Sequence, residues 1–410
     1  MEPAWAHRLI GLTHTALHSE ADGGTRVKVP LLDLKRSYRD VEEELTRALA
    51  ELLRSQLMIL GKGVTELETG LTELCDVRFA VGCASGTDAL LLALMAARVG
   101  PGDEVITTPF TFFASVGSIA RVGATPVFVD IDRRTFNIKP EGIKAAVTDR
   151  TKAVMPVHLY GQSAEMDPIL EIAKRHGLAV IEDAAQSIGA TWRGRACGSM
   201  GTIGCLSFYP TKNLGAAGDA GALLTNDATL AEELRSLRVH GALPSQPYVH
   251  RRVGFNSRLD EMQAVVLNVK MKHLAAWTDA RRKLAAYYDA TLADVDAVST
   301  PAVADGCEHV YHLYVVRTPE RDALMAHLDK RGVTSRVYYP VPMHLQECFR
   351  SLGYASGDFP EAERASAEVL ALPMFPGLTT DEQDHVCASI RAFFAKGRSQ
   401  ASVTEAGTAD

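Results

Sequence analysis

The sequence predicts an α/β protein with a mainly parallel central sheet and a smaller α+β domain toward its C-terminal end. Two observations support this fold class. Short apolar runs bounded by Gly, Pro or Asp alternate with helical patterns over 79–225. A long helical pattern follows Arg258, and strand and helix patterns alternate again after it. Apolar strands that alternate with amphipathic helices are typical of βαβ units, whose sheet is covered by helices on both faces.

The large domain contains six predicted strands and four predicted helices. The strands are FAVGC, EVITT, TPVFVDI, KAVMPVH, LAVIED and GALLT. The helices between them are TDALLLALMAARV, FFASVGSIARV, PEGIKAAV and DPILEIAKRHG, in which apolar residues recur every three or four positions. Because parallel strands need a crossover between them, this order favours a parallel sheet.

The pattern after Arg258 predicts one long helix that bridges two domains, DEMQAVVLNVKMKHLAAWTDARRKLAAYYDA. It is followed by strand HLYVVR, helix RDALMAHLDKRG, strand TSRVYY and helix EAERASAEVLAL. Both ends of the chain lack sustained periodicity and contain small polar residues. We therefore expect a flexible extension over 1–27, a large domain over 28–275, a small domain over 276–396 and a flexible tail over 397–410.

Composition excludes several classes of protein. Of the 410 residues, 47% are hydrophobic and 23% are charged, which excludes disorder of the whole chain. The formal net charge of −7 argues against a nucleic-acid partner, although backbone amides can still bind one small anion. No run of 18 apolar residues predicts a membrane helix. The seven cysteines are odd in number and form no C-x-x-C pair, so we expect no metal site and a reducing cytoplasm.

The segment Ala84–Leu90 is a candidate anion site, because a predicted strand ends there, a turn of small residues follows and a helix begins. Helix N-termini have free amides and a partial positive charge, so they hold phosphate. Gly86 allows close approach of the backbone, and the hydroxyls of Ser85 and Thr87 add donors. Simple helix capping by Ser85 or Thr87 is the alternative. The segment matches neither of the common nucleotide-binding glycine motifs.

Two further residues stand out, although each has an ordinary explanation when taken alone. Asp183 follows strand LAVI, and ligands of open α/β sheets bind at the carboxyl ends of strands; a helix-capping role is the alternative. Lys212 lies in a segment rich in Gly and Ala with no acidic neighbour before Asp219. A lysine in such surroundings becomes a nucleophile when its amine pKa is lowered; the alternative is a surface lysine beside a loop.

Together the three sites match what pyridoxal phosphate requires. A lysine bonds to the cofactor aldehyde, an acid keeps the pyridine nitrogen protonated, and a helix start holds the phosphate. The flat ring also needs an aromatic face. Phe112 in TTPFTFFAS is the candidate, with Phe110 and Phe113 as alternatives and core packing as the ordinary role of all three.

With these residues in place, the chain resembles the pyridoxal-phosphate aminotransferases of nucleotide-linked keto sugars, the DegT/DnrJ/EryC1/StrS type. The family has the aspartate-aminotransferase-like fold, fold type I. The resemblance covers about Leu31 to Phe394. It rests on VPLLDLKRSY, ILGKGVTELE, SGTDALLLAL, GDEVITTPFTFFAS, GATPVFVDID, VHLYGQ, IEDAAQSIGA, SFYPTKNLGAAGDAGALLTND, VGFNSRLDEMQAVVL and YYPVPMHLQ, in the order that the family has them.

The resemblance implies a role for each matching residue. Lys212 would bond to the cofactor and then move the proton, Asp183 would pair with the pyridine nitrogen, and Gln186 would contact the ring hydroxyl. Phe112 would stack on the ring. Asn256 would reach the phosphate of the neighbouring subunit's cofactor, which implies a homodimer with shared sites; a cap before the long helix is its alternative role. The implied phosphate-binding residues are Gly86, Thr87 and Ser207.

Within the family, Tyr209 and the loop Gly218–Gly221 resemble enzymes that aminate carbon 3 of the sugar. The likeness is greatest to aminases of UDP-linked 3-keto-N-acetylglucosamine or its uronic acid, and dTDP is the alternative nucleotide. The resemblance implies L-glutamate as the amino donor and a role in polysaccharide biosynthesis. Arg258 and Tyr339 match implied substrate residues, whereas Tyr338 replaces a histidine. Arg258 has a local alternative, an ion pair with Asp260 or Glu261. A 4-aminotransferase, a dehydratase and a non-catalytic regulator remain alternatives, although a regulator would tolerate loss of Lys212 or Asp183.

Overall fold

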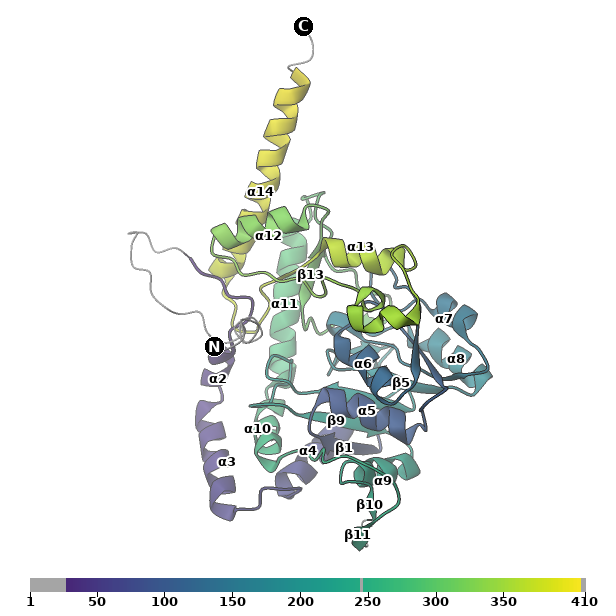
Figure 1. Cartoon of the computed structure of the whole chain (residues 1–410). Helices are drawn as coiled ribbons and strands as arrows, with labels where there is room; N and C mark the ends of the chain where they lie inside the picture. The colour runs from purple at the N-terminus through teal and green to yellow at the C-terminus, as the bar shows by residue number, and fades with distance from the viewer. Residues whose placement is uncertain (1–26, 244–245, 407–410) are drawn as a thin grey trace, which may run out of the picture.

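A seven-stranded sheet with helices around it forms the body of the protein (Figure 1). The computed structural model describes residues 27–243 and 246–406. The predicted extension over 1–27 therefore lies outside the described residues except for its last position. No helix within the described ranges is both long and apolar enough to cross a bilayer.

The central sheet confirms the predicted α/β class. All neighbouring strands pair in parallel except at β9, which runs antiparallel to both of its neighbours. β8 is the one strand of this sheet that was not among the six predicted strands. The strand order is β1 (Phe79–Cys83), β9 (Gly221–Thr225), β8 (Ile203–Ser207), β5 (Ala179–Asp183), β4 (Thr151–Val154), β2 (Glu104–Thr107) and β3 (Thr125–Phe128).

Both faces of this sheet are buried, as its uninterrupted apolar strands predict. Successive side chains of a strand point to opposite faces, so neighbouring residues enter different cores. Cys205 and Leu223 pack in one core with helices α5 and α9, whereas Leu206 and Leu224 pack in another with α4 and α10. The bounds of these helices are α4 (Lys62–Cys75), α5 (Gly86–Ala96), α9 (Ala228–Leu237) and α10 (Glu261–Met271).

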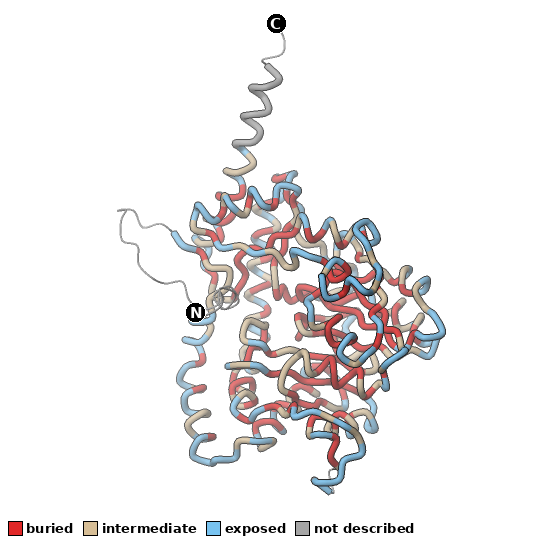
Figure 2. The backbone as a smooth tube through the Cα atoms, viewed as in Figure 1, coloured by how far each residue is buried: buried red, intermediate tan, exposed pale blue. Residues whose placement is uncertain are grey.

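The remaining helices of this part lie at the N-terminal end and in the crossovers. The first three helices of the described residues, α2, α3 and α4, precede the first βαβ unit and were not predicted. Many of their residues are exposed, as the pale blue stretches of α2 and α3 show (Figure 2). The bounds are α2 (Leu34–Arg39), α3 (Glu42–Ser55), α6 (Phe113–Arg121), α7 (Pro140–Ala146) and α8 (Met166–His176).

The predicted bridging helix is two helices. α10 ends at Met271, and α11 (Leu274–Leu292) begins after a turn in which the His273 amide donates to the Lys270 carbonyl at 3.0 Å. This i→i−3 bond tightens the chain and ends the regular helix. Neither a proline nor a glycine marks the break, so the apolar periodicity continues through it unchanged.

The C-terminal part pairs β13 (Tyr314–Arg317) with β14 (Val369–Leu372) in antiparallel fashion. The predicted helix EAERASAEVLAL is helical only as α13 (Pro360–Glu368), because its apolar end VLAL is the fully buried strand β14. The predicted strand TSRVYY forms no regular strand and pairs only at Arg336, through an isolated bridge to Ala371. α12 (Arg321–Lys330) completes this part, and α14 (Thr380–Ala406) continues as a helix into the segment expected to be a flexible tail.

Short elements connect these parts. β6 (Thr191–Trp192), β7 (Arg195–Ala196) and β12 (Cys307–Glu308) form a small sheet, and a hairpin of β10 (Ala242–Leu243) and β11 (Gln246–His250) projects from the body (Figure 1). Within the described ranges, 3₁₀ turns occur at Leu159–Gly161, Met343–Leu345 and Glu347–Leu352.

An ion pair joins the N-terminal helix α2 to the C-terminal helix α14. Two guanidinium nitrogens of Arg36 donate to the two carboxylate oxygens of Glu382, each at 2.7 Å. The hydrogen bond from Arg36 lowers the pKa of Glu382 to about 2, and the same bond raises the pKa of Arg36. Bidentate pairs of this kind are stronger than single surface contacts.

We expect Glu382→Gln to lower the free energy of unfolding by about 1–2 kcal/mol at neutral pH. Because the folded-state pKa of Glu382 is depressed, this stabilisation is present above about pH 4.5 and is lost as the pH falls toward about 2. Urea unfolding of both proteins at several pH values measures the difference. Glu66→Gln, which breaks the exposed pair with Lys62, is the control and is expected to change little.

Candidate active site

The residues singled out from the sequence meet at one edge of the central sheet. β5 ends at Asp183 and β8 ends at Ser207, and these strands run parallel. α5 begins at Gly86, directly beside the end of β8. The carboxyl ends of parallel strands share one edge, which is where open α/β sheets bind their ligands.

Close backbone approach shapes the candidate anion site. A side chain on Gly86 would place its Cβ 2.5 Å from the Cβ of Ser207, and one on Gly221 would lie 2.4 Å from the carbonyl oxygen of Ser85. Only glycine fits at both positions. The amides of Gly86 and Thr87 precede the first bond of α5, which Ala89 donates to Ser85 at 2.9 Å.

Ser85 also has the ordinary role considered for it. Its hydroxyl accepts the amide of Asp88 at 3.0 Å and caps α5. The Asp88 carboxylate in turn accepts the hydroxyl of Ser257 at 2.8 Å. Capping and anion binding are therefore compatible, because different amides serve each purpose.

Asp183 is buried and its backbone is held firmly. Its amide donates to the carbonyl of Pro156 at 2.9 Å, and its carbonyl accepts the amide of His158 at 3.0 Å. One carboxylate oxygen accepts the amide of Ala185 at 3.2 Å, and the other accepts the hydroxyl of Ser115 at 2.6 Å. Asp183 caps no helix, because a turn rather than a helix follows β5.

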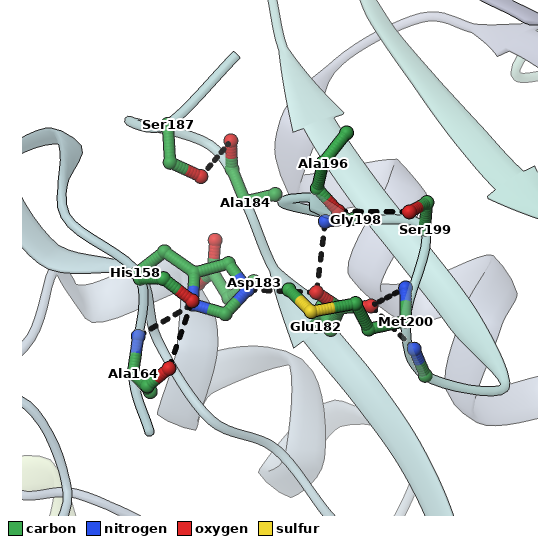
Figure 3. A network of polar contacts seen from close by, with 12 residues as sticks. His158, Ala164, Glu182, Asp183, Ala184, Ser187, Ala196, Gly198, Ser199 and Met200 are labelled. Atoms are coloured by element: carbon green, nitrogen blue, oxygen red, sulfur yellow. Dashed lines mark hydrogen bonds and ion pairs between the residues drawn. The ribbon is translucent and has the colours of Figure 1, made fainter. Parts of the chain in front are cut away.

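The neighbouring Glu182 points to the opposite face of β5 and is fully satisfied there (Figure 3). His158 accepts the Ala164 amide at Nδ1, 3.0 Å away, so its Nε2 is the nitrogen that donates to Glu182 at 2.8 Å. Three backbone amides also donate to this carboxylate: those of Gly198 (2.8 Å), Met200 (2.7 Å) and Gly201 (2.5 Å). Glu182 thus fixes the end of β5, while Asp183 faces the site.

The segment that contains Lys212 is held by α10 on one side. The Ala217 amide donates to the side-chain oxygen of Gln263 at 2.8 Å, and Lys270 Nζ donates to the Gly215 carbonyl at 2.6 Å. The Lys212 amide itself donates to the Tyr209 carbonyl at 2.8 Å. Lys212 is therefore part of an ordered turn and not of a flexible surface loop.

The other side of this segment is held by the chain before β13. Asn213 Nδ2 donates to the Val310 carbonyl at 3.1 Å, and its Oδ1 lies 3.3 Å from His312 Nδ1. Burial lowers the pKa of His312 far below its usual value, and the positive charges of Lys212 and Arg281 lower it further. The imidazole is therefore neutral and adds no positive charge beside Lys212.

Burial is the dominant influence on the Lys212 amine and lowers its pKa to about 8, while the negative charge of Asp183 acts in the opposite direction. At neutral pH a much larger fraction of the amine is thus unprotonated than in an exposed lysine. The structure therefore brings together a reactive amine, a buried carboxylate and an open helix N-terminus.

Gln186 connects this edge to the C-terminal part. Its side-chain oxygen accepts the Tyr160 amide at 2.7 Å, and its nitrogen donates to the Tyr339 hydroxyl at 3.0 Å. The Tyr160 hydroxyl donates to the carbonyl of Tyr338. Tyr339, predicted as a substrate residue, therefore lies directly against a predicted cofactor residue.

Of the three candidate aromatic rings, Phe112 alone remains exposed toward solvent without a stacked partner. Phe110 is fully buried and packs on Tyr160. Phe113 stacks on Phe349 with ring centroids 5.6 Å apart. Phe112 is 55% exposed, and its ring lies 6.0 Å from that of Tyr339.

Asn256 and Arg258 lie on the chain that precedes α10. Asn256 is exposed and does not cap that helix, whose N-cap is Asp260. Arg258 is paired through its backbone with Cys83. The alternative ion pair of Arg258 with Asp260 or Glu261 is not found among the described residues. Glu261 instead accepts the amides of Gly61 and Val64 at the start of α4.

Sequence reasoning missed the partners that hold the site. Ser115, Thr111 and Tyr160 contact predicted residues directly or through one hydroxyl. In the sequence, these residues were marked only by their position in TTPFTFFAS and VHLYGQ, two of the segments that resemble the family. Neither segment shows which distant residue its side chains meet.

Comparisons with known proteins identify the family to which the chain belongs. The model of the DegT/DnrJ/EryC1/StrS aminotransferase family matches residues 39–391. A pleiotropic regulatory protein of Geobacillus stearothermophilus is 54% identical over 90% of this chain and 99% of its own length. The UDP-N-acetyl-3-dehydro-alpha-D-glucosamine 3-aminotransferase of Acidithiobacillus ferrooxidans is 46% identical over 88% of this chain and 97% of its own.

A solved structure also has this fold. NtdA of Bacillus subtilis, determined with its bound cofactor PMP, aligns with a TM-score of 0.84 and 33% sequence identity. The alignment covers 90% of this chain and 86% of NtdA.

We expect covalent capture of pyridoxal phosphate by the cofactor-free protein to accelerate with rising pH and to level off above about pH 8, because only the neutral amine reacts. For a lysine with the ordinary pKa of about 10.4, the rate of capture would continue to rise up to that pH. Stopped-flow visible absorbance measures the rate. Lys212→Ala should abolish capture, and Lys62→Ala, which removes an exposed amine, should not change it. A plateau absent below pH 10 would contradict the lowered pKa of Lys212.

Proposed function

Because the chain belongs to the DegT/DnrJ/EryC1/StrS aminotransferase family and is a pyridoxal-phosphate-dependent aminotransferase, we propose that it aminates carbon 3 of a nucleotide-linked 3-keto hexose. The proposed donor is L-glutamate. The proposed acceptor is UDP-3-keto-N-acetylglucosamine or its uronic acid, in polysaccharide biosynthesis. The observation that carries this proposal is the Tyr209 and Gly218–Gly221 pattern in a chain 46% identical to a protein named for 3-amination of a UDP sugar.

The residues at the sheet edge fit the cofactor. Because Gly86 has no Cβ, the start of α5 approaches Ser207 closely, and the first amides of the helix lie beside the Ser207 hydroxyl as donors of the kind that a phosphate group requires. We assign the phosphate to Gly86, Thr87 and Ser207 and the ring face to Phe112. We assign the pyridine nitrogen to Asp183 and the ring hydroxyl to Gln186.

The cofactor, when bound, supplies an aldehyde for the amino group and a ring that withdraws electrons from the reacting carbon. In our proposal Lys212 first holds the cofactor through its amine and then moves a proton as a positioned base. Its pKa of about 8 suits both tasks near neutral pH. Asp183 lies beside it, and its negative charge is what a protonated ring nitrogen needs.

Arg258, Tyr338 and Tyr339 are the proposed substrate residues. Arg258 has a guanidinium suited to the diphosphate or a sugar carboxylate. Burial raises the pKa of Tyr338 and of Tyr339, so both phenols are neutral hydrogen-bond donors at physiological pH. The Tyr338 phenol replaces the histidine of similar proteins, and it presents a different donor to the sugar.

We also propose that the enzyme is a cytoplasmic homodimer. Apolar side chains are exposed in the segment of chain that leads to Asn256: Tyr248 is 95% and Val253 88% exposed, and Phe255 is 37% exposed. Tyr248 lies in the β10–β11 hairpin that projects from the body (Figure 1). Burial of this patch against a second copy would remove apolar surface from water and direct Asn256 toward the partner's phosphate.

A regulatory role is the second candidate, because the relative at 54% identity is named a pleiotropic regulatory protein. The presence of Lys212, whose amine is buried beside Asp183, favours catalysis over binding alone. A 4-aminotransferase and a dehydratase are the catalytic alternatives. The product formed distinguishes the 3-aminotransferase, the 4-aminotransferase and the dehydratase, whereas a regulator would form no product.

We expect purified enzyme with glutamate to convert a UDP-3-keto sugar to the product in which an amine replaces the ketone oxygen. A panel of UDP- and dTDP-linked 3-keto and 4-keto sugars, with mass spectrometry of the products, measures this. Lys212→Ala should form no product. Loss of the hydroxyl as water would indicate a dehydratase, activity only on 4-keto sugars would overturn the assignment to carbon 3, and no turnover on the panel would favour the regulator.

The shared site predicts complementation between two inactive variants. Lys212→Ala and Asn256→Ala homodimers should each be impaired, because each lacks a residue of every site. A heterodimer of the two, purified through two different tags, should regain about half of the wild-type activity, since one of its two sites is complete. No regain would show that Lys212 and Asn256 serve the same subunit's cofactor.

A further inference from the structure

A short chain of buried hydroxyl groups ends on the carboxylate of Asp183. Ser115 Oγ lies 2.6 Å from Asp183 Oδ2, and Thr111 Oγ1 lies 2.8 Å from Ser115 Oγ. All three residues are buried, with exposed fractions of 5% for Asp183, 1% for Thr111 and 0% for Ser115. The chain is therefore shielded from water, where hydrogen bonds have most effect on a charge.

The direction of these hydrogen bonds follows from the groups themselves. An ionised carboxylate only accepts, so the single hydrogen of Ser115 is donated to Asp183. The Ser115 oxygen must then accept, and Thr111 donates to it. Both hydroxyls thus point their hydrogens toward the carboxylate, and the bond from Thr111 polarises the one from Ser115.

The position of the chain in the fold links it to the cofactor ring. Thr111 and Ser115 flank Phe112, and the Ser115 amide donates to the Phe112 carbonyl at 3.3 Å at the start of α6. One turn of chain therefore carries the proposed ring-stacking residue, the hydroxyl that donates to Asp183 and the hydroxyl that donates to Ser115. Among the described residues, the other oxygen of Asp183 accepts one longer hydrogen bond, from the Ala185 amide at 3.2 Å.

We propose that Thr111 and Ser115 are positioning residues that keep Asp183 ionised and oriented toward the pyridine nitrogen of the cofactor. The inference rests on the role of Asp183 proposed above. Hydrogen bonds donated to a carboxylate favour its charged form. A proton shared between Asp183 and the ring nitrogen therefore stays on the nitrogen, where it makes the ring a stronger electron acceptor.

Ser118 shows what an ordinary buried hydroxyl on the same helix does. It is 0% exposed and donates to the Ala114 carbonyl at 2.6 Å, within α6. Its hydrogen satisfies a helix carbonyl and reaches no charged group. Ser118→Ala is therefore a matched control for Ser115→Ala, because both remove one buried oxygen from α6.

The test is ¹⁵N NMR of the holoenzyme loaded with ring-labelled pyridoxal phosphate, since the chemical shift of the ring nitrogen reports its protonation. We expect wild type and Ser118→Ala to show a protonated nitrogen. Ser115→Ala and Thr111→Val should move the signal toward the unprotonated value, the first by more. Thr111→Ser and Ser115→Thr retain a hydroxyl, so both should show the chemical shift of the protonated nitrogen, as wild type does.

Steady-state kinetics give a second measure. Because the hydrogen bond from Ser115 reaches a charged group, we expect Ser115→Ala to reduce kcat by roughly 10- to 100-fold with little change in KM. Thr111→Val, which preserves side-chain shape, guards against a folding defect in the serine variant.

Asp183→Asn separates failure of this inference from failure of the proposed role of Asp183. If Asp183→Asn shifts the ¹⁵N signal and neither hydroxyl variant does, the positioning role of Thr111 and Ser115 is wrong while that of Asp183 stands. If Asp183→Asn leaves the signal unchanged, Asp183 does not pair with the ring nitrogen, and both assignments fail.

Discussion

Burial of the Lys212 amine beside the Asp183 carboxylate is the interaction on which the rest of the site depends. Burial lowers the lysine pKa to about 8, and the nearby negative charge limits that shift. A buried amine and a buried carboxylate must coexist in one low-dielectric region, which costs free energy unless both groups are held in place by partners. The hydrogen bonds around both residues meet this requirement.

Alternation along β5 explains how the fold holds the acid. Glu182 faces one side of the strand and accepts four hydrogen bonds there, whereas Asp183 faces the other side (Figure 3). Glu182 carries no assigned chemistry, yet it ties β5 to the turn before β8 and to the segment of His158. The rigid end of the strand then sets the position of Asp183, in the way that supporting contacts orient functional groups elsewhere.

The C-terminal part contributes to the site through a few contacts that span the sequence. Tyr339 accepts a hydrogen bond from Gln186, and the Val310 carbonyl accepts one from Asn213 beside Lys212. A change in the position of this part would therefore move the surroundings of both the proposed cofactor and the proposed substrate. In the proposed assignment a substrate residue, Tyr339, hydrogen-bonds directly to a cofactor residue, Gln186, so the tyrosine at position 338 next to it would act close to the reacting centre.

The sequence by itself determined the α/β class, six strands of the central sheet and the residue types of the site, because strand periodicity and motifs such as EDAAQ are local properties. It also determined that Lys212 and Asp183 are candidates. The break between α10 and α11 and the strand character of VLAL depended on packing that periodicity does not encode. The partners were decided only by the tertiary structure: Ser115 lies 68 positions from Asp183, and Tyr339 lies 153 positions from Gln186. Contacts over such separations arise when strand ends and crossovers converge at one sheet edge, and the polar groups buried there must find partners.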